Sequence, residues 1–412
     1  MDVSKIPVID THEHIDNIYR WNPEDVGLLH VLMENHYLVA DIVAADPANA
    51  GKSFTEPGIS PRYDLDQAKG KLSSAEYEKA VRWFIERLPL VAHTSDWKSE
   101  WFGLRDLYGL KDPLITEKNW SAIDKRIRKR YENRDKWYLE IFDRARVKTL
   151  FWCYGEPKLK GSSRAVIHHN DFIWRECGDI RDTASLADAF NRFMDGEIQK
   201  HNPVSLKIGS AYNRDINFIK RTLEEVDAAL RKAEPKTCFA QIPEVSDFIH
   251  QLMAELSART GIPVQIHTGI LAGNTLMNPL TATYASRADA FFARNPGTRF
   301  DIFHGSFPQW GEAVAIARRF PNVWLNTCWV PTLSESMCQA MLNAALDSVP
   351  VNKIMWGGDS HSPEMAYGVL KLFRGIVGRV VSSRGADAKL AREAAEWILW
   401  RSAAELYKLS VD

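Results

Sequence analysis

The sequence has little cysteine and no long hydrophobic run. Its five cysteines are scattered over 412 residues without a C-x-x-C pair, at Cys153, Cys177, Cys238, Cys328 and Cys338. A disulfide framework or a zinc ribbon is therefore not expected, and a reducing cytoplasm fits this usage. No apolar run approaches the ~20 residues that span a bilayer, and the N-terminus lacks the apolar core of a signal peptide. We therefore expect a cytoplasmic protein without a membrane partner.

Neither sign of charge is in excess. Lys and Arg number 52, Asp and Glu number 53, and the formal net charge is −1, so a nucleic-acid partner is not expected. Tryptophan, by contrast, is plentiful, with 14 residues. Because indole rings are costly to expose, this number predicts a thick core, an aromatic-lined pocket or an oligomer interface. A homo-oligomer is compatible with this composition.

Short apolar runs recur along the chain, and helical stretches separate most of them. Eight such runs are predicted to be strands, at residues 7–11, 147–154, 172–176, 204–208, 263–267, 299–304, 322–327 and 353–356. Nearly continuous β-rich runs that alternate with helices are typical of a parallel sheet covered on both faces. Eight units predict an α/β fold, a (β/α)8 TIM barrel formed by residues 1–412 as one domain. A doubly wound open sheet is the alternative, and the missing G-x-G-x-x-G after the first run disfavours it.

The first two predicted strands are far apart. Residues 17–146 lie between them and read as mainly helical, most clearly at 74–88 and 119–146. We therefore expect a large helical insertion subdomain after the first strand. A final helix at 391–409 is expected to close the barrel.

Four histidines and one aspartate fall where predicted strands stop. His12 and His14 end the first run, His267 the fifth, His304 the sixth and Asp359 the eighth. The carboxyl ends of barrel strands meet at one rim, and residues i and i+2 share a face, so these side chains are expected to converge. Imidazole and carboxylate suit Zn, Mn or Fe(II). The pattern predicts a divalent metal site, with Zn preferred.

The ordered set His12-x-His14, His267, His304, Asp359 resembles the amidohydrolase superfamily. The stretches VQIHTG, FHGSFPQWGE and GGDSHSPE resemble more closely its amidohydrolase-2 group, which includes decarboxylases of the aminocarboxymuconate-semialdehyde type. The insertion after strand one is similar to that of uronate isomerases. The resemblance implies that His12, His14 and Asp359 bind the metal and that His267 binds or flanks it. His304 would bind a second metal or polarise the substrate, and Asp359 would also accept a proton from the nucleophilic water.

Lys207, at the end of the fourth run, allows three interpretations. In some binuclear amidohydrolases a carbamylated lysine at this strand bridges two metals, and His267 and His304 would then bind the second ion. An unmodified ammonium would instead bind a substrate carboxylate, and one metal would be expected. The third interpretation, ranked below these two, is a lysine that reaches solvent.

Four further residues are candidates for substrate binding. Tyr212 and Arg214 follow the fourth run, where Arg214 would either clamp a carboxylate or form an ordinary ion pair. Trp329 follows the seventh run and would line the pocket or, more simply, pack in the core. His361 lies two residues beyond Asp359 and could reach the pocket. The other histidines lack a strand-end position and are expected to be structural or exposed: His30, His36, His93, His168, His169, His201 and His250.

These features predict a metal-dependent hydrolase. It would use metal-activated water on an amide, ester or lactone bond of a small polar, carboxylated substrate. A metal-dependent, non-oxidative decarboxylase and a uronate-type isomerase are the alternatives with nearly the same residues. A non-catalytic binding protein on a degenerate barrel is a fourth reading, which the intact ligand set disfavours. Fold and metal site do not fix the substrate.

Overall fold

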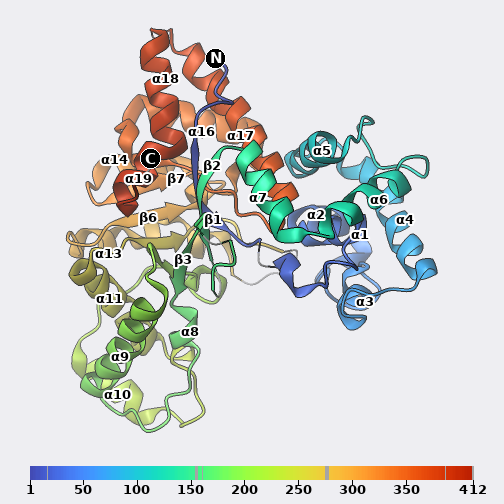
Figure 1. Cartoon of the computed structure of the whole chain (residues 1–412). Helices are drawn as coiled ribbons and strands as arrows, with labels where there is room; N and C mark the ends of the chain where they lie inside the picture. The colour runs from blue at the N-terminus through green and yellow to red at the C-terminus, as the bar shows by residue number, and fades with distance from the viewer. Residues whose placement is uncertain (16, 154–155, 160, 274–277, 386, 411–412) are drawn as a thin grey trace.

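The barrel is built from eight parallel strands. The computed structural model describes residues 1–15, 17–153, 156–159, 161–273, 278–385 and 387–410 (Figure 1). Each strand pairs with the next in sequence, in the order β1 to β8. The strands are β1 (Val8–Glu13), β2 (Val147–Trp152), β3 (Ser163–His168), β4 (Ser205–Ile208), β5 (Val264–His267), β6 (Phe300–Phe303), β7 (Val323–Asn326) and β8 (Ile354–Met355). The predicted (β/α)8 fold is confirmed.

Hydrogen bonds join the last strand region to the first. The Thr11 N–H and hydroxyl both donate to the Trp356 carbonyl, at 3.4 and 2.8 Å. Two more backbone bonds, from Asp359 to His12 and from His14 to Ser360, continue this seam at 2.8 Å each. The loop after β8 is therefore held against the end of β1.

The third strand differs from the prediction. Residues 172–176 do not form a strand, because the short helix α8 (Asn170–Ile173) occupies their start. Phe172 packs there against Phe190 and Phe239, with ring centroids 5.3 and 5.4 Å apart. The strand is instead β3, in which Val166 pairs with Ser205. The predicted second strand ends at Trp152, and its last position, 154, lies outside the described residues.

Helices cover the outside of the sheet. Between β3 and β8 these include α9 (Thr183–His201), α10 (Leu223–Lys232), α11 (Pro243–Thr260), α13 (Asp289–Arg294), α14 (Trp310–Arg319) and α16 (Glu335–Ser348). Alternate apolar side chains of β5 to β7 are fully buried in the core that these helices share. The predicted final helix is divided into α18 (Ala388–Glu396), a π-helical turn (Trp397–Arg401) and α19 (Ser402–Tyr407), and α19 contacts β1 and β8.

The segment between β1 and β2 is helical, as predicted. It contains α1 (Leu28–Glu34), α2 (His36–Ala44), α3 (Arg62–Gln67), α4 (Ser74–Val91), α5 (Ser95–Tyr108), α6 (Trp120–Tyr131) and α7 (Arg134–Arg144). Figure 1 shows α1 to α6 as a group beside the barrel. Most of their apolar residues form a core of their own, so we propose that residues 17–146 are an insertion subdomain. It meets the barrel where α5 packs on α17 (Pro363–Ser383).

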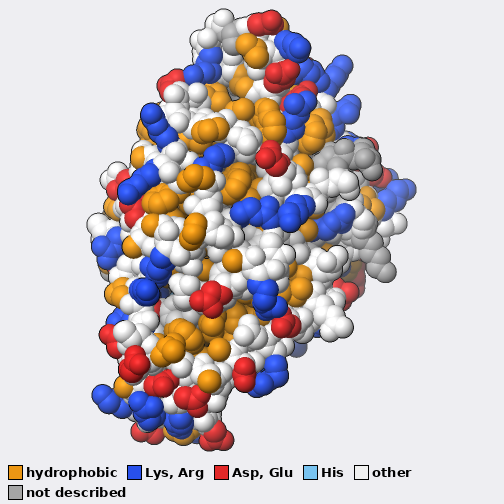
Figure 2. Space-filling model, turned by 90° about the vertical axis from the view of Figure 1, so that its left-hand side faces the viewer, with side chains coloured by type: hydrophobic (Ala, Val, Ile, Leu, Met, Phe, Trp, Pro, Cys, Tyr) orange, Lys and Arg blue, Asp and Glu red, His pale blue; other side chains and the backbone are white. Residues whose placement is uncertain are grey.

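Neither a membrane-spanning helix among the described residues nor a single-sign patch on the face in Figure 2 is seen. No helix among the described residues has the length and hydropathy needed to cross a bilayer. On the face shown in Figure 2, Lys and Arg side chains are interspersed with Asp and Glu and with small hydrophobic areas. Most tryptophans are buried or half-buried, while Trp174 is 44% exposed.

Candidate metal centre

The predicted site residues converge at the carboxyl ends of the strands. A cavity of about 250 Å³ opens there. Its lining includes every predicted site residue except Arg214 and Trp329. The lining residues are His12, His14, Tyr37, Cys153, His168, Asn170, Lys207, Gly209, Tyr212, His267, Ala272, His304, Asp359 and His361.

His12, His14 and Asp359 form the tightest cluster in this cavity. The two Nε2 atoms are 3.1 Å apart, and each lies 3.3 Å from Asp359 Oδ1. His12 is on β1 and His14 directly follows its last residue, Glu13, so the two histidines alternate with Glu13 and face the barrel mouth. Asp359 has a left-handed backbone with φ 58°, a conformation that costs energy and is often found at functional sites.

The spacing of these three atoms fits a bound metal ion. Ligands about 2.0–2.2 Å from one ion stand roughly 3.0–3.5 Å from each other in octahedral or tetrahedral geometry. The observed separations of 3.1, 3.3 and 3.3 Å lie in that range. Two imidazoles and a carboxylate are also donors that Zn, Mn and Fe accept. These residues therefore fit a divalent cation.

The protonation states suit metal binding as well. Burial, and next the charge of Lys207, lower the pKa of His12 well below its usual value. Burial alone would raise the pKa of Asp359, but hydrogen bonding and charge from His12, with His14 and His304, hold it well below its usual range. A neutral imidazole and an ionised carboxylate are the forms that bind metals.

Two buried carboxyl groups hold the ligand-bearing segments together. Asp10 Oδ1 accepts hydrogen bonds from the backbone N–H groups of His12 and Gly358, at 3.2 and 2.9 Å. Glu13 Oε2 accepts one from Ser360 at 2.7 Å. Burial raises the pKa of Asp10 to about 6. Sequence analysis did not single out these residues, although both lie within the D-T-H-E-H stretch that contains the metal ligands.

His267 and His304 form a second pair in the cavity. His304 Nε2 lies 3.1 Å from His267 Nδ1, and His267 Nε2 lies 2.9 Å from the Ile270 carbonyl. His304 Nδ1 lies 3.2 Å from the Cys328 carbonyl and 3.9 Å from Asp359 Oδ2. Three of these contacts, one between the two rings and two to carbonyl oxygens, would each need an N–H hydrogen to be a hydrogen bond. Two neutral imidazole rings carry only two such hydrogens. Burial, and next the charge of His267, lower the pKa of His304 well below its usual value, so this ring is neutral beside Asp359.

Lys207 is buried and does not reach solvent. Its side chain is on β4, and the residue is 3% exposed. Nζ has no hydrogen-bond partner among the described residues and lies 3.8 Å from the centroid of the Phe303 ring. Burial lowers the pKa of the ammonium. The solvent-reaching interpretation is therefore wrong, which leaves a modified lysine or a cation available to a substrate anion.

The substrate-binding candidates occupy different places. Tyr212 lines the cavity, its ring 4.8 Å from that of His267, and His361 stacks on His14 at 5.5 Å. Trp329 is buried against Tyr37, with centroids 4.3 Å apart, as in the core-packing interpretation.

Arg214 points elsewhere. Its guanidinium pairs with buried Asp247 at 2.5 Å and lies outside the residues that line the cavity. This is the ion pair that the sequence allowed as one alternative.

Six lining residues were missed by sequence analysis, namely Gly209, Ala272 and four with polar or thiol side chains. His168 ends β3, so the rule that strand ends carry site residues would have found it had that strand been placed correctly. Cys153 follows β2, and Asn170 begins α8. Tyr37 comes from α2 of the insertion, and no local sequence pattern predicts that its side chain faces Asp359.

A family model supports this site in the second half of the chain. Residues 245–409 match the model described as Amidohydrolase. The match contains β5 to β8 and the ligand candidates His267, His304 and Asp359, but not the His-x-His pair on β1.

Similar proteins extend the comparison. Protein fluG of Emericella nidulans is 27% identical over 203 residues, which are 48% of this chain and 23% of that protein's length. Two solved structures resemble the whole fold. The uronate isomerase of Bacillus halodurans C-125 has a TM-score of 0.69 at 14% identity, and the match covers 99% of this chain and 95% of that protein's chain. The glucuronate isomerase of Caulobacter crescentus has a TM-score of 0.70 at 15% identity, and the match covers 100% of this chain and 93% of that protein's chain.

At these identities the solved structures establish a shared fold and nothing about the substrate. The family match and the ligand cluster together support an enzyme of the amidohydrolase superfamily with a divalent metal.

Proposed function

We propose that this protein is a metal-dependent hydrolase of small carboxylated molecules, acting on an amide, ester or lactone bond. The observation that carries the proposal is the cluster of His12, His14 and Asp359, whose ligand atoms are 3.1–3.3 Å apart at the wall of a closed-in cavity. The five scattered cysteines, without a C-x-x-C pair, support a cytoplasmic location.

His12, His14 and Asp359 would hold the ion. A divalent metal supplies Lewis acidity there and lowers the pKa of water toward ~7. Asp359, whose Oδ2 lies 3.9 Å from His304 Nδ1, can then accept a proton and return it to the leaving group. We propose one ion, with Lys207 as an unmodified ammonium that does not bridge two metals.

The cavity also limits the substrate. Its volume of about 250 Å³ is below the ~300–1,000 Å³ of drug-sized ligand pockets, which favours a small molecule. The Lys207 ammonium is buried in its wall without a hydrogen-bond partner among the described residues. Because an unpaired buried cation is costly, a substrate carboxylate is the natural partner for it.

An isomerase that acts on a uronate is the second candidate. The observation that favours it is Tyr37, which the insertion brings into the cavity beside Asp359. A carboxylate and a phenol on one cavity can exchange protons with neighbouring carbon atoms of a sugar acid. The likeness to two uronate-type isomerases over the whole chain agrees with this alternative.

Turnover in ¹⁸O-labelled water separates these reactions. The zinc-loaded protein is offered a panel of N-acyl amino acids, lactones and hexuronates. Hydrolysis places one ¹⁸O in the product, whereas isomerisation of a hexuronate gives a product of unchanged mass, and a decarboxylase would release carbon dioxide.

Two variants test the assigned residues. His12→Ala and Asp359→Asn should remove the activity while circular dichroism shows an intact fold. His201→Asn, on α9 outside the cavity, is the control. Full turnover in either site variant would overturn the proposal.

A further inference from the structure

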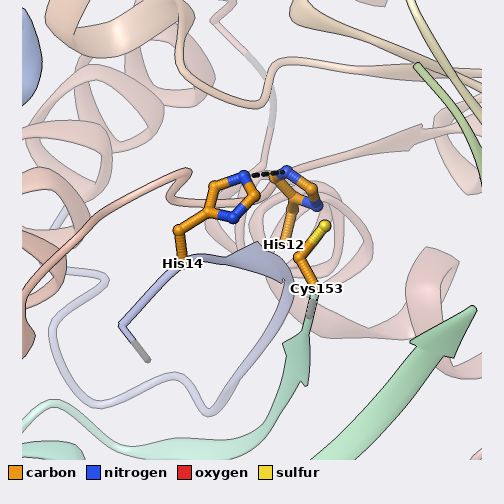
Figure 3. Close-up of side chains that lie close together, drawn as sticks. All are labelled: His12, His14 and Cys153. Atoms are coloured by element: carbon orange, nitrogen blue, oxygen red, sulfur yellow. Dashed lines mark hydrogen bonds between the residues drawn. The ribbon is translucent and has the colours of Figure 1, made fainter. Parts of the chain in front are cut away.

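Cys153 is placed beside the metal-binding histidines by the register of β1 and β2. Its backbone N–H donates to the Glu13 carbonyl at 3.2 Å, and Glu13 pairs with Trp152 in the sheet. Side chains alternate along a strand, so Cys153 faces the cavity while Trp152 packs in the core of the insertion. Figure 3 shows the sulfur next to the His12 ring.

The sulfur is within reach of an ion held by the two histidines. Sγ of Cys153, one ring nitrogen of His12 and one of His14 all lie within 4.8 Å of one another. Cys153 is 1% exposed and lines the same cavity as Asp359. A Zn–S bond of about 2.3 Å is longer than a Zn–N bond of about 2.0–2.1 Å, so sulfur can coordinate from a greater distance.

We propose that Cys153 is a further protein ligand of the ion bound by His12, His14 and Asp359. This inference rests on the metal site of the proposed function and not on its reaction. On binding, the S–H bond breaks, an S–metal bond forms and the proton leaves to solvent.

Charge balance favours this ligand set. Asp359 alone leaves a divalent ion with one uncompensated positive charge in a buried site, and a Cys153 thiolate cancels it. Burial lowers the pKa of the Lys207 ammonium, and the charge of Cys153 is the largest of those that partly offset this effect. The Lys207 ammonium would thus attract the Cys153 thiolate and could still bind a substrate carboxylate.

A thiolate ligand also selects the metal. Soft sulfur favours zinc and similar ions, whereas Mg, Ca and Mn prefer oxygen. The protein should therefore discriminate strongly against Mn²⁺, which imidazole and carboxylate alone would accept.

Cobalt substitution tests the ligand directly. Co²⁺-loaded wild-type protein should show a near-ultraviolet sulfur-to-cobalt charge-transfer band, and Cys153→Ser should lose it while still binding Co²⁺. Zinc affinity, measured by chelator competition, should fall at least about tenfold in Cys153→Ser, and Mn²⁺ affinity should change much less. Cys338→Ser, a buried thiol on α16, is the control and keeps the band.

Cys328 is the competing source of the band. Its sulfur lies within 4.8 Å of ligand atoms of His304 and Asp359 but does not line the cavity. A band that survives in Cys153→Ser and disappears in Cys328→Ala would overturn the assignment. Cobalt bound to wild type without any sulfur band would overturn it too and leave the proposed function standing. Failure of wild type to bind Co²⁺ or Zn²⁺ would reject both.

Discussion

The contact between α5 and α17 yields a sharp prediction for stability. At Gly368 an added Cβ would lie 1.8 Å from the backbone oxygen of Ser99 and 3.2 Å from the Gly103 nitrogen. Ordinary contact begins near 3.4 Å, so the two helices would have to separate by about 1.6 Å, the difference between 3.4 and 1.8 Å. Both neighbours are backbone atoms, which cannot rotate away.

We expect Gly368→Ala to lower the free energy of unfolding by about 2 kcal/mol. Overpacking costs ~1–3 kcal/mol and a backbone clash belongs at the upper end, while alanine returns up to ~1 kcal/mol of helix propensity. Gly196→Ala is the matched control, because Gly196 lies within α9 with nothing within 4 Å of the added Cβ. The control should be more stable than wild type by ~0.5–1 kcal/mol.

Urea denaturation followed by tryptophan fluorescence, with EDTA present, measures both variants. The midpoint should fall for Gly368→Ala and rise for Gly196→Ala with little change in slope. Helix α17 begins at Pro363, two residues after His361, which stacks on His14. Gly368→Ala should therefore also weaken zinc binding. A Gly368→Ala protein as stable as wild type would refute the close helix contact.

Three further predictions concern the metal and pH. Asp359→Asn should weaken zinc binding at least about tenfold in a chelator competition, and unchanged affinity would remove Asp359 from the ligand set. Elemental analysis should find one zinc per chain, whereas two would favour a bridging Lys207. Burial lowers the pKa of His30 to about 4, so the unfolded chain binds a proton at His30 at a higher pH than the folded chain does. The resulting contribution of His30 to the free energy of unfolding is present above pH ~6.5 and is lost as the pH falls toward 4. Metal-free wild type should lose about 3 kcal/mol more than His30→Gln over that range, and parallel pH profiles would contradict this.

The barrel could be predicted because its strands are short apolar runs with clear borders. β3 was the exception, since Ser163 and Arg164 interrupt its apolar pattern while the aromatic run that begins at Phe172 imitates a strand. That single error hid His168, whose position at a strand end depends on knowing the strand.

The site was predictable as far as strand ends determine it. His12, His14, His267, His304 and Asp359 do line one cavity. Tyr37 was not predictable, because its place depends on how α2 packs over the barrel mouth, and such long-range packing leaves no local pattern. Cys153 was missed because a cysteine at the end of an apolar run looks like an ordinary core residue.

The seam between β8 and β1 has a consequence for biosynthesis. Thr11 and Trp356 are bonded across 345 residues, so the His-x-His pair leaves the ribosome long before its carboxylate partner exists. Contacts of such large sequence separation form late and slowly. At the proposed metal site, ion binding would therefore require a newly made chain that has brought β8 back to β1, and a chain that stops before Asp359 should be released without an ion.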